Sequence, residues 1–170
     1  MSFVRFLFIL ITALVFPALR VESAPVKSAE YFSVKRVIDG DTIELSDSRR
    51  VRLIGIDTPE VHFSKKLLKD ARKSKKDILA IRKLGAKAAS FSRDLCLNKK
   101  VRLEYDVEKK DKYNRDLAYV YLEDGTFVNA RIIEEGYGQV MTVPPNVKSA
   151  DLFLKLQRTA RENNRGLWKE

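Results

Sequence analysis

The chain has 170 residues, which suits one folded domain preceded by a short leader. Its 33 lysines and arginines outnumber 23 aspartates and glutamates, which gives a net charge of +10. This charge indicates a polyanionic partner, with nucleic acid as the first candidate and an anionic membrane as the second. A single histidine, His62, and a single cysteine, Cys96, exclude a zinc site built from these residues, a two-histidine ribonuclease mechanism and an intrachain disulfide.

Residues 1–23 have the pattern of a secretory signal peptide. A basic start is followed by the apolar run Phe6–Leu19, which is shorter than the ~20 residues that a membrane-spanning helix needs. Small residues permit cleavage after Ser23, and an uncleaved N-terminal membrane anchor is the alternative. We therefore expect export to the periplasm or the medium, with 24–31 as a polar tether and 32–170 as the folded domain.

Three short β-strands are predicted at the start of this domain. Enrichment in β-branched residues marks Phe32–Ile38, Thr42–Leu45 and Val51–Ile56. Turn-forming residues separate them at Asp39–Asp41 and at Asp47–Ser48. Short strands joined by tight turns predict an antiparallel meander.

A long charged stretch follows the third strand and contains a predicted amphipathic helix. Apolar residues recur there at spacings of three and four, at Ile81, Leu84, Ala88, Phe91 and Leu95. Cys96, next to this pattern, is expected to be a small buried hydrophobic residue. The very basic segment 63–76 is interpreted as a solvated surface extension, with electrostatic guidance of a polyanion as the alternative.

The second half of the domain predicts two more strands and two more helices. The strands are Val101–Tyr105 and Leu117–Leu122, and the latter ends at the Asp124-Gly125 turn. A helix over Val128–Glu135 is expected to end at Gly136, and a last helix, Leu152–Ala160, to stop at Gly166. Five strands with a helix after the third predict an α+β fold, mainly a five-stranded OB-fold barrel with about three packed helices.

Two acidic segments carry the candidate chemistry. Asp41 and Asp57 lie at strand ends that can converge, and their carboxylate oxygens suit Ca²⁺ or Mg²⁺. Glu60 can take a proton from an attacking water. Arg52 and Arg115 are fixed cations, and each can pair two phosphate oxygens. Each feature alone is typical of a turn, a helix start or an exposed strand residue, but together they indicate a site that cleaves phosphodiesters.

These residues, in order, resemble the staphylococcal nuclease (thermonuclease) family. The resemblance covers roughly Phe32–Trp168 and rests on short motifs, namely Ile38–Thr42, Arg52–Glu60, Asp111–Arg115, Leu117–Tyr121, Val128-Asn129 and Gly166–Trp168. It implies an OB-fold barrel with three helices and Ca²⁺-dependent hydrolysis of DNA and RNA that leaves 3′-phosphate ends. A noncatalytic nucleic-acid-binding module of the same fold is the alternative.

The resemblance also implies a role for each motif residue. Asp41 and Asp57 would bind Ca²⁺ through their side chains, and Thr58 through its backbone carbonyl. Arg52, Glu60 and Arg115 would form the catalytic set. Lys112 and Tyr113 would contact the nucleotide, with single-stranded DNA or RNA as the substrate and a monomer as the active form. Membrane association is expected only if the leader remains uncleaved.

This chain departs from the family pattern in two places. The basic segment between Glu60 and the Ile81–Leu95 helix is longer. Met141–Pro145 stands where the best-known member has tyrosines, one of which stacks on the base. Loss of a stacking ring costs about 1–3 kcal/mol per base, so base preference is open, whereas the phosphate chemistry is not affected.

Overall fold

The computed structural model describes residues 29–61, 68, 71–72 and 77–169. The predicted leader 1–23, His62 and most of the basic segment 63–76 therefore lie outside the described residues. Within the described part of the chain, no helix combines the length and the hydrophobicity of a membrane span.

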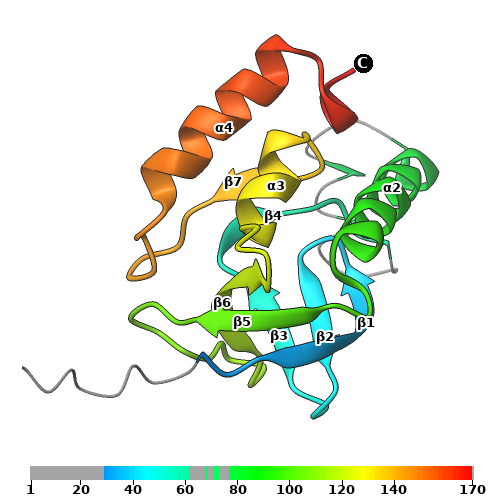
Figure 1. Ribbon diagram of the computed structural model, residues 1–170. Coiled ribbons are helices and arrows are strands. Elements are labelled where there is room, and N and C mark those ends of the chain that lie inside the picture. The colour runs from blue at the N-terminus through cyan, green and yellow to red at the C-terminus, as the bar shows by residue number, and fades with distance from the viewer. Residues whose placement is uncertain (1–28, 62–67, 69–70, 73–76, 170) are drawn as a thin grey trace, which may run out of the picture.

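A closed five-stranded barrel forms the lower half of the molecule (Figure 1). Its strands are arranged in the order β1 (Phe32–Asp39), β2 (Thr42–Leu45), β3 (Arg50–Leu53), β6 (Asp116–Leu122) and β5 (Lys100–Glu104). Strands β3 and β6 pair in parallel, whereas the other neighbours are antiparallel. The predicted α+β fold with a five-stranded barrel is confirmed.

The predicted third strand, Val51–Ile56, is wrong as a single element. The chain breaks it at Ile54, so that β3 stays in the barrel while β4 (Gly55–Asp57) pairs with β7 (Gln139–Met141) in a separate two-stranded sheet. Gly55 has φ +79°, a conformation that other residues avoid, and a β-carbon there would lie 2.5 Å from the Phe153 ring. The glycine redirects the chain because only it fits this place.

Helices from the described part of the chain pack on the barrel and on the small sheet. They are α2 (Ile78–Cys96), α3 (Val128–Glu134) and α4 (Ala150–Glu162). In Figure 1, α2 lies beside β1 and β2, and α4 crosses over α3 and β7 at the far end. The barrel interior and the undersides of the helices share one hydrophobic core, which includes the fully buried Tyr119 and Phe153.

The ends of two helices test the predicted glycine stops. Gly136, with φ +76°, comes directly after Glu135, the C-cap residue of α3, and confirms the first stop. The second is wrong, because α4 ends at Glu162 and the left-handed residue after it is Asn164, with φ +49°. Gly166 instead opens the short 3₁₀ helix η1 (Gly166–Trp168).

Candidate active site

Asp41 joins the two acidic segments. Its carboxylate is buried, and Oδ2 accepts hydrogen bonds from the backbone N–H and the hydroxyl of Thr58, at 2.8 and 2.9 Å. Oδ1 accepts a third bond, from the hydroxyl of Thr42 at 3.0 Å. The predicted convergence of the turn before β2 with the end of β4 is therefore confirmed.

Arg52 lies between the two aspartates. Its Nη1 is 3.2 Å from Asp41 Oδ1, and its Nη2 is 3.1 Å from Asp57 Oδ1. Nη1 also donates to the carbonyl of Ile56 at 2.8 Å, which fixes the guanidinium in place. Its side chain is only 12% exposed, so these contacts are shielded from solvent on most sides.

The donor set around Arg52 fits a hard divalent cation. Asp41 and Asp57 together carry two negative charges against one from the guanidinium. Thr58 follows Asp57 directly and is buried, so its carbonyl is the third candidate ligand. No group of three or more His, Cys, Asp or Glu with metal-site geometry occurs among the described residues, and two carboxylates plus a carbonyl suit a weakly held Ca²⁺ that keeps several waters.

Helix α2 supports both acidic segments, which the sequence did not reveal. Ser92 donates from its hydroxyl to the carbonyl of Gly40 at 2.6 Å. A β-carbon at Gly85 would lie 2.6 Å from the carbonyl carbon and oxygen of Glu60, so the helix touches the backbone of that residue. A glycine inside an otherwise regular helical pattern was the available signal for this close approach.

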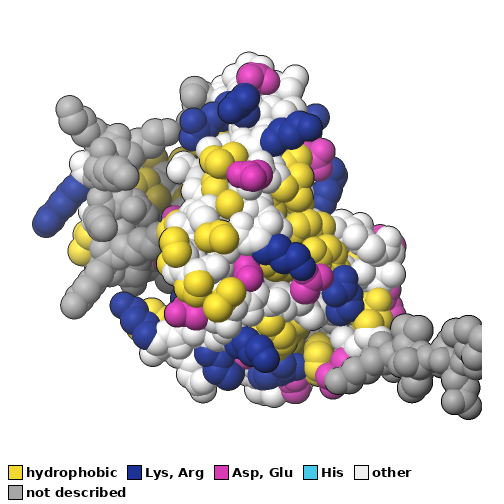
Figure 2. Space-filling model, turned by 90° about the vertical axis from the view of Figure 1, so that its left-hand side faces the viewer, with side chains coloured by type: hydrophobic (Ala, Val, Ile, Leu, Met, Phe, Trp, Pro, Cys, Tyr) yellow, Lys and Arg dark blue, Asp and Glu magenta, His cyan; other side chains and the backbone are white. Residues whose placement is uncertain are grey.

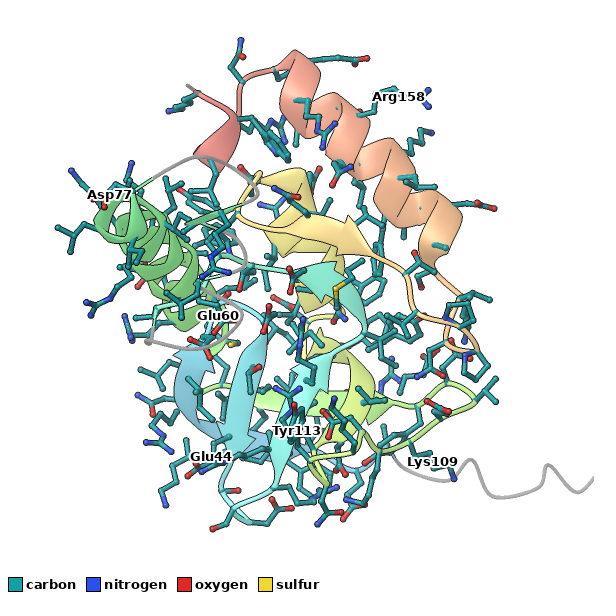
Figure 3. All side chains as sticks on the ribbon, turned by 180° about the vertical axis from the view of Figure 1, so that it is seen from behind. Glu44, Glu60, Asp77, Lys109, Tyr113 and Arg158 are labelled. Carbon is teal, nitrogen blue, oxygen red and sulfur yellow. The ribbon has the colours of Figure 1, made fainter. Side chains whose placement is uncertain are left out.

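Glu60 lies beside α2 and is half-buried (Figure 3). It follows Asp57 by three residues, so the same stretch of chain positions the candidate metal ligand and the candidate base. Tyr113 lies lower on the same view, over the barrel strands. The structure thus places Glu60 at the α2 side of the site, away from the loop that carries Tyr113.

A loop between β5 and β6, residues 110–115, presents the second arginine. Asp111 organises it, accepting at Oδ1 from the backbone N–H of Tyr113 (2.9 Å) and of Arg115 (3.0 Å), and at Oδ2 from Arg115 Nε (2.7 Å). Burial alone would raise the pKa of Asp111, but these hydrogen bonds and the Arg115 charge outweigh it and hold the pKa below its usual range. Among the described residues, the ion pair of Arg115 runs through its Nε, which leaves its Nη groups for a ligand.

Lys112 and Tyr113 lie at the tip of this loop. The lysine Nζ is 5.1 Å from the centre of the Tyr113 ring, and the Arg115 guanidinium is 5.5 Å from it. The ring is 69% exposed, so its face is open to a ligand. The predicted nucleotide-contacting pair is therefore placed next to the second arginine.

An open groove connects the two arginines. It has a volume of about 810 Å³ and is lined by Arg52 and Arg115, by Lys112 and Tyr113, and by the apolar residues Ile54, Met141 and Val143, among others. Two guanidinium groups on one groove can bind the oxygens of one phosphate. The apolar residues line the same groove as the two arginines.

Cys96 takes no part in this site. It is fully buried, donates from its thiol to the carbonyl of Ser92 at 2.9 Å, and burial raises its pKa to about 12. The prediction of a small buried hydrophobic residue is confirmed, since a thiol with this pKa is not a nucleophile at neutral pH.

The family model and the similar proteins all indicate the same family. The family model described as "Staphylococcal nuclease homologue" matches residues 50–170, which include Arg52, Asp57, Glu60 and Arg115 but not Asp41. Thermonuclease of Staphylococcus intermedius is 39% identical over 142 residues, 82% of this chain and 76% of that protein. Thermonuclease of Staphylococcus hyicus is 34% identical over 86% of this chain and 85% of its own length. The SPbeta prophage-derived endonuclease YokF of Bacillus subtilis is 33% identical over 80% of this chain and 43% of its own length. The chain belongs to the staphylococcal nuclease family.

Proposed function

We propose that this protein is a Ca²⁺-dependent nuclease that hydrolyses DNA and RNA with little sequence specificity. One observation carries the proposal: Arg52 contacts the paired carboxylates of Asp41 and Asp57 and also lines the groove that contains Arg115. A cation site and a phosphate site therefore share one residue. The names of the relatives, two thermonucleases and an endonuclease, support the same activity.

The residues divide the work of phosphodiester hydrolysis. Asp41 and Asp57, with the carbonyl of Thr58, would hold Ca²⁺, which supplies Lewis-acid polarisation of the phosphate. Arg52 and Arg115 bind phosphate oxygens and offset the charge that accumulates there during the reaction.

Glu60 orients the attacking water or accepts its proton. Departure of the 5′ oxygen then leaves a 3′-phosphate end, which the likeness to the thermonucleases supports. Such ends distinguish this reaction from hydrolysis that leaves 5′-phosphates.

The groove supports a preference for single-stranded substrates. Tyr113, Met141 and Val143 give it exposed apolar surface, and only an unstacked base can reach such a surface. Flexible Met141 and β-branched Val143 offer no ring for stacking and no polar pattern to read. Weak discrimination among bases follows from this surface.

Export agrees with the proposed cofactor. Residues 1–23 would direct the chain out of the cytoplasm. Outside the cell, calcium reaches the millimolar levels that a site with two carboxylates needs. The active form is proposed to be a monomer, since one chain supplies the metal ligands, both arginines and the groove. Sequencing the N-terminus of the exported protein tests the leader, and an intact Met1 would favour the anchor.

The decisive experiment is cleavage of single-stranded DNA and RNA by the purified protein. We expect cleavage with added Ca²⁺, arrest by excess EGTA, and 3′-phosphate ends on the products. E60Q should bind the same oligonucleotide but lose about 10²–10⁴ in rate, the usual contribution of a positioned acid–base residue. Binding without cleavage by the wild-type protein would instead favour the noncatalytic module, and cleavage that persists in EGTA would refute the calcium requirement.

A further inference from the structure

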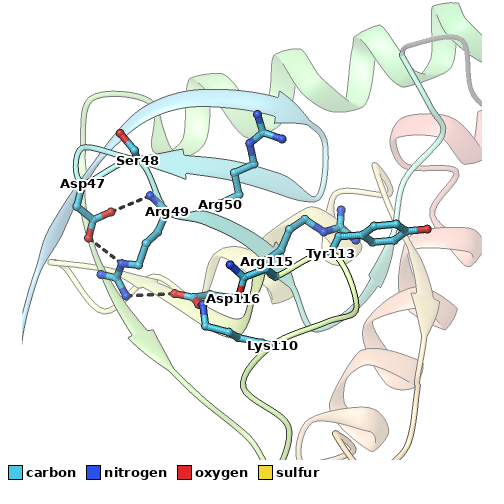
Figure 4. A pocket seen from close by; sticks show the side chains of 9 residues that line it. Asp47, Ser48, Arg49, Arg50, Lys110, Tyr113, Arg115 and Asp116 are labelled. Atoms are coloured by element: carbon cyan, nitrogen blue, oxygen red, sulfur yellow. Dashed lines mark hydrogen bonds and ion pairs between the residues drawn. The ribbon is translucent and has the colours of Figure 1, made fainter.

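A second cavity adjoins the groove along β3. It has a volume of about 530 Å³ and lies between the β2–β3 turn and the 110–115 loop (Figure 4). Three residues, Lys110, Tyr113 and Arg115, line both this cavity and the groove, so the two spaces lie next to each other. Arg50 lines the second cavity and is not part of the site described above.

The strand places Arg50 and Arg52 side by side. On β3, Val51 and Leu53 are buried in the barrel, so Arg50 and Arg52 both face outwards. Two residues of a strand span about 6.6 Å. The ~3.4 Å rise per nucleotide of a duplex strand is measured along the helix axis, and the through-space distance between successive phosphates of a strand is longer than this rise. Successive phosphates of an unstacked single strand can separate to this extent.

The charges in the second cavity leave Arg50 available. Arg49 is held by Asp47 at 2.7 Å and by Asp116 at 3.1 Å, and Lys110 is held by Asp116 at 2.7 Å. Arg50 forms no ion pair within 4.0 Å with any described carboxylate, and no dashed line reaches it in Figure 4.

The carboxylate opposite Arg50 is already neutralised by other cations. This is Glu44, the cross-strand partner of Arg50 on β2. It accepts from Arg36 at 2.7 Å, with Lys35 at 3.9 Å. Arg50 therefore carries the positive charge of this cavity that no neighbouring carboxylate binds at close range.

On the face shown in Figure 2, lysine and arginine side chains are dispersed and mixed with hydrophobic ones. Arg50 differs from them because it extends a line that begins at the phosphate-binding Arg52.

We propose that Arg50 binds the phosphate next to the scissile one, and that the second cavity is a backbone subsite for single-stranded nucleic acid. The inference rests on the proposed function, because it takes Arg52 and Arg115 as ligands of the scissile phosphate. Arg50 is then a residue that favours longer strands over dinucleotides. Tyr113 and Arg115 border both subsites and separate the two phosphates.

The test compares R50A with R158A, which removes the same charge from an exposed position on α4 (Figure 3). The measured quantity is the ratio of kcat/KM for a thymidine trinucleotide to that for the dinucleotide, which has no neighbouring phosphate. We expect R50A to lower this ratio about three- to tenfold, as for one partly exposed charged contact, and R158A to leave it at the wild-type value. Equal ratios in the two variants would overturn the proposal.

Neutral methylphosphonate linkages identify the contacted phosphate. Two substrates carry the neutral linkage next to the scissile one, on its 5′ side or on its 3′ side. In one of these two substrates, the difference in kcat/KM between wild type and R50A should disappear. Persistence of the full difference in both positions would also overturn the proposal.

Binding in EGTA separates this proposal from the proposed function. The slope of log affinity against log salt for an oligothymidylate should fall by about 0.7 in R50A relative to R158A, as expected for one phosphate contact on a single strand. A wild-type protein that binds in EGTA and still does not cleave after calcium is added would refute hydrolysis, and the salt slope would then decide the role of Arg50. A wild-type protein that does neither would refute both.

Discussion

Replacing Arg52 by alanine should destabilise the protein and at the same time increase the effect of calcium. Removal of the guanidinium takes away the cation that contacts the carboxylates of both Asp41 and Asp57. Breaking a buried ion pair costs about 3–5 kcal/mol, and because the Asp57 side chain is 26% exposed we expect about 2–4 kcal/mol here. Calcium can supply the missing charge, so it should stabilise R52A more than the wild type.

The assay is urea denaturation of both proteins with EGTA and with calcium. R36A is the matched control, because Arg36 forms a comparably short pair with Glu44, at 2.7 Å, but is 58% exposed. This control should lose less than about 1 kcal/mol and should not change its response to calcium. Activity of R52A should fall by about 10²–10³ even at saturating calcium, as for loss of one group that stabilises the transition state.

Two results would refute this reasoning. If R52A and R36A lose the same free energy of unfolding in EGTA, the contacts of Arg52 do not behave as buried ion pairs. If calcium raises the unfolding free energy of R52A by no more than it does for the wild type, Arg52 and the metal do not share the two carboxylates.

Three further perturbations test how the site is supported. N129A should lower the free energy of unfolding in urea by about 2–5 kcal/mol, because buried Asn129 accepts from the Val120 N–H and donates to the Ile54 carbonyl, and the substitution removes the partner of both groups. The control N163A removes an exposed hydrogen bond and should cost less than about 1 kcal/mol. Equal costs for the two variants would contradict the argument. G85A should destabilise the protein and lower its activity, because the new methyl group would meet the Glu60 backbone. A Gly→Ala change inside a helix ordinarily has the opposite effect and stabilises by about 0.5–1 kcal/mol. A more stable, fully active variant would disprove the close contact. The pKa of Asp111 is lowered in the folded state, so its ionised carboxylate stabilises the fold fully above the unfolded pKa of about 3.9, and this stabilisation is lost as the pH falls through the lower pKa of the folded state. The difference in unfolding free energy between wild type and D111N should therefore shrink below about pH 4 and stay constant above it.

Much of the fold was predictable because its signals are local. Strand alternation, the apolar spacing in α2 and the turn residues before β2 depend on neighbours in the chain, and the structure confirms each of them. The failures occur where distant residues decide. Phe153 on α4 occupies the space of a β-carbon at residue 55, so a glycine is needed directly after the break at Ile54, and the pairing of β4 with β7 joins segments that are about 80 residues apart. The stop expected at Gly166 failed for the same reason, since that glycine packs closely against Glu135 and Gly136.

The residue types of the candidate site followed from the sequence alone. Asp41 and Asp57 could be chosen because a chain with one histidine and one cysteine leaves carboxylate oxygens as side-chain ligands for a metal, and Arg52 and Arg115 because each guanidinium can pair two phosphate oxygens. Order and spacing were sufficient for that choice. They contain no information on which carboxylate faces which cation.

Only the tertiary structure decided how these groups act on one another. It shows one guanidinium bridging both aspartates, the contact of α2 with Glu60, and the alignment of Arg50 with Arg52 beside a second cavity. The physical reason is that such relations depend on the closure of the barrel, which brings residues far apart in sequence within hydrogen-bonding distance. Chemical character is a property of single residues and short motifs, whereas the sharing of charge among them is a property of the folded chain.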